Sequence, residues 1–109
     1  MAVFDDFLNE LKTELSSFAE KNWKDFAKSA ISDGEAFLDK TKVDFERWVG
    51  LLASGSLSKD DFEWLVVGKK DLVELQSLKQ AGLAQVALDR FVNGLIDIVI
   101  NAAFTAIKV

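Results

Sequence analysis

The feature that most constrains this chain is an apolar stripe at helical spacing in a sequence without proline. The chain has 109 residues and no proline. Over most of the span from Phe4 to Leu52, apolar side chains recur three or four positions apart, and polar side chains fill the gaps. That spacing places the apolar residues on one face of a helix. Because proline is the strongest helix breaker, the stripe predicts long amphipathic helices and an all-α fold.

One point inside the stripe has two interpretations. Ser32 followed by Glu35 has the spacing of a capping box, which would begin a second helix. Alternatively, Gly34 lies on the buried stripe of a single helix, where glycine costs about 1 kcal/mol relative to alanine. The continuous three-to-four spacing favours one helix, with a bend at Gly34 as a variant.

The segment ASGSLSKDDF predicts the main turn of the chain. It contains a cluster of serine and glycine at 54–58, which is typical of loops. Ser58 is a candidate N-cap, and Asp60 and Asp61 would follow in the first helical turn, where the helix dipole favours negative charge. A second helical segment is therefore expected to begin here.

Together these signals predict a single helical domain, folded as a long antiparallel hairpin. Each arm would be roughly 75 Å long if straight, at 1.5 Å per residue. If Gly34 and Gly68 break the arms, the same pattern predicts a compact three- or four-helix bundle instead. The predicted divisions of the domain, residues 1–109, are arm one at about 3–53, the turn at about 54–58 and arm two at about 59–108.

The end of the chain, LIDIVINAAFTAIKV, is the most apolar segment. Its polar residues form a narrow stripe that includes Arg90, Asp97 and Asn101. A helix with so narrow a polar face is expected to be buried on most sides, and one neighbouring arm would cover only part of it. We therefore predict that the hairpins self-associate as a homo-oligomer. The candidate interface residues are Phe91, Leu95, Ile96, Val99, Ile100, Ala103 and Phe104.

Two alternatives concern this same helix. The polar stripe is interpreted as facing solvent, although Asp97 and Asn101 could instead pair inside an oligomer core and fix its register. The apolar face could also contact a lipid surface. A full membrane span is disfavoured, because the apolar stretch is near the lower length limit and contains Asp97. Interfacial helices usually have basic polar faces, and this one has few bases.

Composition narrows the function. The net charge of −5 and the pI of about 4.6 argue against a nucleic-acid partner. Without cysteine or histidine, the chain forms no disulfide and lacks the usual ligands for zinc, haem or iron–sulfur centres. The first residues do not resemble a signal peptide, so a cytoplasmic location is expected.

No motif indicates catalysis. Glu10 and Glu14 stand one helical turn apart, a spacing that can hold a metal, but a solvated acidic face is the favoured interpretation. Serine nucleophiles lack a histidine base. The chain is therefore predicted to be non-enzymatic, with no catalytic residues, cofactor or metal.

Trp64 is the candidate anchor for a protein partner, because it lies off the centre of its apolar stripe and tryptophan is enriched at binding hot spots. The competing interpretation is a flank residue folded over the hairpin seam. The sequence as a whole predicts an oligomeric helical protein with a structural or protein-interaction role. The alternative is a lipid- or membrane-surface protein that uses the C-terminal helix.

Overall fold

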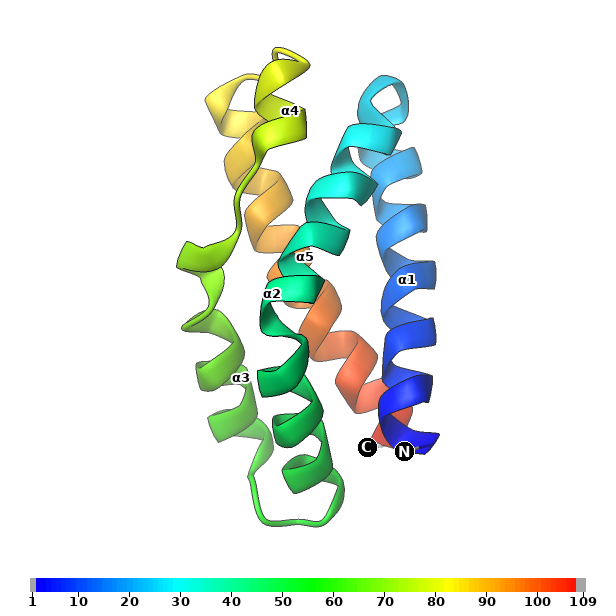
Figure 1. The fold of residues 1–109 in the computed structure, drawn as a ribbon, viewed down its shortest axis with the longest axis vertical. Helices are drawn as coiled ribbons and strands as arrows, with labels where there is room; N and C mark the ends of the chain where they lie inside the picture. The colour runs from blue at the N-terminus through cyan, green and yellow to red at the C-terminus, as the bar shows by residue number, and fades with distance from the viewer. Residues whose placement is uncertain (1, 108–109) are drawn as a thin grey trace.

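The computed structural model describes residues 2–107, and every regular element within them is helical. This confirms the predicted all-α class. The helices pack side by side, with the start of α1 and the end of α5 at the same end of the molecule (Figure 1). The elements are α1 (Ala2–Asn22), η1 (Lys24–Phe26), α2 (Ala27–Ala53), α3 (Lys59–Val67), η2 (Lys70–Leu72), α4 (Gln76–Gln80) and α5 (Gln85–Ile107).

Helix α1 forms as the apolar stripe predicts, but it ends earlier than expected. Trp23 has non-helical backbone angles, φ −138° and ψ 60°, and a short 3₁₀ turn follows. Its side chain is buried, with its ring 4.8 Å from that of Phe18 and 5.7 Å from that of Phe91, centroid to centroid. The prediction of one helix through residues 3–53 is therefore wrong at Trp23, where neither proline nor glycine marks the break.

Gly34 does not break the chain. It lies buried inside α2, so Ser32 starts no helix and the capping-box interpretation is wrong. A Cβ atom at Gly34 would lie 2.7 Å from the Leu15 Cδ2 atom of α1. The glycine therefore allows α1 and α2 to approach closely, which explains its place on the buried stripe.

The turn between α2 and α3 has the predicted position and cap. Helix α2 ends at Ala53, and Gly55 has a positive φ of 81°, which glycine adopts without strain. The Ser58 hydroxyl oxygen accepts a hydrogen bond from the Asp61 backbone N–H at 3.1 Å. This satisfies one of the free N–H groups at the start of α3.

The second arm is broken three times. Helix α3 ends at Val67, with Gly68, the position of the predicted kink, as its C-cap. The chain is not helical at 73–75, between η2 and α4, and Gly82 has a φ of 90° in the turn between α4 and α5. Between these breaks, the short helix α4 begins against α2, because the buried Asp33 carboxylate accepts hydrogen bonds from the backbone N–H groups of Ser77 and Leu78. Helices α3 and α4 consequently follow one another along α2 (Figure 1).

These breaks give a compact molecule. Its longest extent is 42 Å, which is too short for two straight arms of about 75 Å. The radius of gyration of 13.7 Å is close to the roughly 13 Å expected for a compact chain of this length. Helix α5 packs against α1, α2 and α3, so its apolar sides are covered by three neighbours.

Candidate interaction surface

The residues predicted to form a subunit seam lie mostly inside the core of one chain. Five of them are buried and two, Ile100 and Phe104, are half-buried. The prediction assumed a hairpin, in which one arm leaves much of the last helix uncovered. Because α5 packs against α1, α2 and α3, most of its apolar surface is buried within one chain. Burial of that surface therefore does not require a second copy. The five buried residues are Phe91, Leu95, Ile96, Val99 and Ala103.

The polar stripe of α5 lies on the outside of the molecule. Arg90, Asp97 and Asn101 are all exposed. The Arg90 guanidinium also lies over the ring of Trp23, 5.9 Å from its centroid. The stripe therefore faces solvent in the single chain, and Arg90 covers the outer edge of the aromatic cluster.

Helix α5 is also the one helix in residues 2–107 that is long and apolar enough to cross a membrane, judged by length and composition. The core helix of a water-soluble protein meets the same criterion. Its apolar side chains at Leu95 and Val99 pack inside the molecule, so lipid contact would require the helices to separate.

The most exposed aromatic side chain among the described residues is Trp64, at 75% exposure. Helix α3 directs Phe62 and Val66 into the core, and both are fully buried. Helical spacing then turns Trp64 and Val67 outward, and Val67 is 49% exposed. The interpretation of Trp64 as a flank folded over a seam does not describe this side chain, because most of its surface is accessible.

Trp64 borders a shallow surface hollow between α2 and α3. The hollow has a volume of about 380 Å³. We call it the Trp64 hollow. Its lining residues are Trp48, Trp64, Leu65, Val67, Gly68 and Lys69. Four of these six are tryptophan, leucine or valine, so the lining is largely apolar.

Charged side chains form a cluster of ion pairs on one side of this hollow. The Lys69 ammonium lies 5.5 Å from the centroid of the Trp48 ring and 2.7 Å from the Asp44 Oδ2 atom. Arg47 approaches the other oxygen, Oδ1, at 3.4 Å. Hydrogen bonding to Lys69 holds the pKa of the Asp44 carboxyl below its usual range. Asp44 therefore stays ionised and holds Lys69 over the ring of Trp48. Trp64 is the tryptophan of this hollow whose ring remains exposed.

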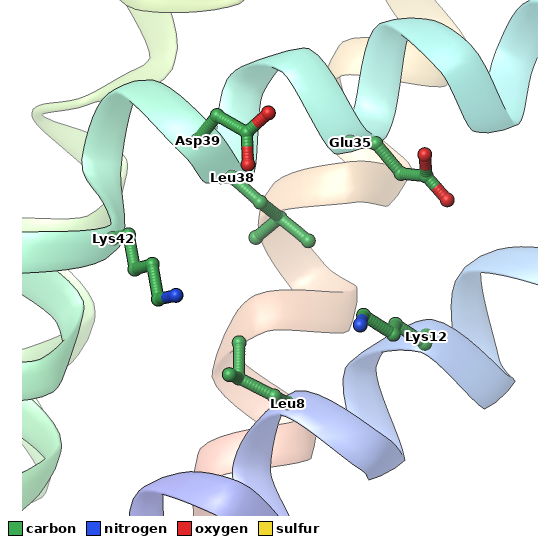
Figure 2. Close-up of a pocket in the computed structure, with 6 residues that line it drawn as sticks. All are labelled: Leu8, Lys12, Glu35, Leu38, Asp39 and Lys42. Atoms are coloured by element: carbon green, nitrogen blue, oxygen red, sulfur yellow. The ribbon is translucent and has the colours of Figure 1, made fainter.

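A second hollow lies between α1 and α2, with a volume of about 200 Å³. Figure 2 shows Lys12 and Lys42 on opposite sides of it, with the side chain of Leu38 above and that of Leu8 below. Glu35 and Asp39 also line it, so two positive and two negative charges sum to zero. The lining gives no preference for a ligand of either charge.

The acidic pair on α1, Glu10 and Glu14, has no third acidic side chain grouped with it among residues 2–107. No group of three or more acidic side chains within 2–107 is placed to share a metal ion. Glu14 is nevertheless unusual, because its Oε2 atom is buried and accepts no hydrogen bond from residues 2–107. Burial raises the pKa of the Glu14 carboxyl above its ordinary value, and the negative charge of Glu10 raises it further.

Three tertiary contacts were not predicted from the sequence. They are the Asp33 cap on α4, the Lys69 contact with Trp48, and the close approach of Phe18 to Gly94. Each joins residues that are far apart in the sequence, so no local spacing signals them. The off-stripe position of Trp64 was the one sequence signal that led to the surface described above.

Comparison of the chain with models of protein families, with curated proteins and with solved structures gave no match. The function must therefore be inferred from the surface itself.

Proposed function

We propose that this chain is a non-enzymatic interaction protein that docks a protein partner on the Trp64 hollow. The observation that carries the proposal is the 75% exposure of Trp64 beside an apolar hollow. Buried Trp23 and Trp48 have packing partners within the chain, whereas Trp64 presents most of its ring to solvent. The self-association predicted from the sequence is a separate proposal, argued in the next subsection with α3 in place of α5 as its location.

The physical gain from docking is large for one residue. Tryptophan side chains bury about 150–250 Å² at interfaces, and apolar burial contributes roughly 25 cal/mol per Å². A tryptophan at the centre of an interface is accordingly a frequent hot spot. Asp44 and Lys69 lie beside the hollow and would form part of the polar rim of such an interface.

Site-specific crosslinking in the native host cells tests the proposal. A photoreactive benzophenone amino acid replaces Trp64 in one variant and Val86 in the control. Val86 lies at the start of α5 and is similarly exposed, at 73%. The expected result is a crosslinked protein of discrete mass from position 64 that is missing from position 86. Identical products from both positions, or none at 64, would overturn the proposal.

Membrane-surface association is the second candidate function, and the length and composition of α5 favour it. It requires α5 to leave its contacts with α1, because its apolar residues are the core of the bundle. Co-sedimentation of the chain with phosphatidylcholine vesicles tests it. Recovery of all the protein in the supernatant, with or without vesicles, would reject this candidate.

A further inference from the structure

We infer that the partner that fits the Trp64 hollow is a second copy of this chain, docked with its α3 antiparallel to the first. The inference rests on the proposed function, since it names the occupant of the same surface. It follows from the order of apolar and charged side chains along α3.

The outward face of α3 carries its exposed apolar side chains in its C-terminal half. Trp64 and Val67 are exposed and lie about one helical turn apart, Trp64 next to the middle residue of α3 and Val67 at its last position. A two-fold axis perpendicular to α3 between these residues would place Trp64 of each copy against Val67 of the other. An interface with this symmetry uses the same patch on both copies, so the single exposed tryptophan finds an apolar surface without a second, different site.

Charges of opposite sign lie on the two sides of this apolar pair along the chain. The N-terminal half carries three acids, Asp60, Asp61 and Glu63, and one base, Lys59, all exposed, so it is net negative. The C-terminal end is followed by Lys69 and Lys70. Antiparallel pairing brings the acidic half of each copy against the basic end of the other, whereas parallel pairing would set like charges together. Charge order therefore selects the antiparallel arrangement.

Neighbouring groups strengthen this order. Arg47 of α2 lies at the same end of α3 as Lys69, because both approach the Asp44 carboxylate. One further acid, Asp71, follows in η2. The basic end therefore contains Arg47, Lys69 and Lys70 against Asp44 and Asp71, and it keeps a net positive charge to meet the acids of the second copy.

The size of the surface indicates a weak dimer. Helix α3 is about 13 Å long at 1.5 Å per residue. A seam centred on it falls at or below the lower end of stable interfaces, about 1,200 Å² in total. The dimer is expected to form at micromolar to millimolar concentrations and to exchange rapidly.

Charge reversal provides a test with an internal rescue. In the antiparallel arrangement, Asp61 of one copy lies opposite Lys70 of the other, because an axis between Trp64 and Val67 pairs these positions. The variants D61K and K70E should each dimerise about tenfold more weakly or worse, because each sets two like-charge pairs across the seam. An equimolar mixture of the two should regain the dimer, since the heterodimer contains only opposite-charge pairs.

The measurement is sedimentation velocity from micromolar to millimolar concentration, with circular dichroism to confirm that each variant is folded. Glu20 is exposed on α1, and E20K is the matched charge-reversal control that should dimerise like the original chain. A second variant, W64A, should remain a monomer throughout. A chain that stays monomeric at millimolar concentration, or a mixture that does not regain the dimer, would overturn the inference.

These outcomes separate the inference from the proposed function. If crosslinking at position 64 captures a different protein and sedimentation shows only monomer, the proposed function stands and the second-copy inference fails. If crosslinking at position 64 gives no discrete product, both fail.

Discussion

The carboxylate of Asp33 on α2 caps helix α4 by accepting the backbone N–H of Leu78 at 2.9 Å, across 45 positions of sequence. Its other oxygen accepts the N–H of Ser77 at 3.0 Å. Helix α4 has no cap from its own N-cap residue, Leu75. A buried acid on one helix therefore supplies the cap that the local sequence of another helix lacks.

Removal of this cap should destabilise the fold. Asp33→Ala leaves two N–H groups of α4 without acceptors, which is expected to lower the free energy of unfolding by about 1–3 kcal/mol. Asp39→Ala is the matched control, because Asp39 is exposed on the same helix. Urea denaturation followed by circular dichroism measures both. Equal losses in the two variants would show that the cap contributes nothing specific.

Two glycines in helices should respond oppositely to alanine. A Cβ atom at Gly94 would lie 2.1 Å from Phe18 Cζ, whereas a Cβ atom at Gly50 meets no other residue within 4 Å. The Phe18 ring cannot retreat freely, because it packs against Trp23 and Phe91. Gly94→Ala should therefore cost about 1–3 kcal/mol from overpacking, partly offset by better helix propensity.

The control variant for this prediction is expected to change the free energy of unfolding in the opposite direction. Gly50→Ala should raise the free energy of unfolding by roughly 0.5–1 kcal/mol, because alanine favours the helix and has room there. Thermal or urea unfolding of both variants provides the comparison. A stabilising Gly94→Ala would mean that α1 and α5 are not packed as closely as described.

The pH dependence of stability should contain a contribution from Glu14. Burial first, and Glu10 second, raise its pKa above the ordinary value of 4.5. The folded chain therefore binds this proton more tightly than the unfolded chain, and stability falls as pH rises through the interval between the two pKa values. The destabilisation persists at neutral pH, where the buried carboxylate is charged.

Glu14→Gln should remove that contribution. The variant is expected to be more stable than the original chain at neutral pH, with the difference shrinking as the pH falls to about the ordinary pKa. Urea midpoints at neutral and mildly acidic pH measure this, with Glu20→Gln as the exposed control on α1. A stability difference that is the same at both pH values would contradict the assignment to this carboxyl.

The parts of the fold that depend on local chemistry were predictable from the sequence. The apolar stripe of α1, the Ser58 cap and the end of α3 at Gly68 each follow from residues within a turn or two of one another. The break at Trp23 was not predictable in this way, because it depends on an aromatic cluster that includes Phe91, far along the chain.

The same distinction applies to α5. The apolar residues around Val99 predict a helix that is buried on most sides, and Val99 is fully buried. Three neighbouring helices bury these apolar side chains. This burial depends on breaks such as the turn at Gly82 and on the Asp33 cap, because they fold the second arm back on itself. Trp64 differs because its outward position follows from its spacing relative to Phe62 and Val66, which is a property of one helix.

The last prediction separates a docking residue from a structural one. Trp64 is 75% exposed, whereas Trp23 is buried in the aromatic cluster. Trp64→Ala should change the free energy of unfolding by no more than about 0.5 kcal/mol, as is usual for exposed positions. Trp23→Ala should cost about 3–5 kcal/mol, as is usual for large buried aromatic residues. Thermal unfolding by circular dichroism, at concentrations low enough to keep the chain monomeric, measures both. A large loss for Trp64→Ala under these conditions would show that Trp64 supports the fold rather than a partner.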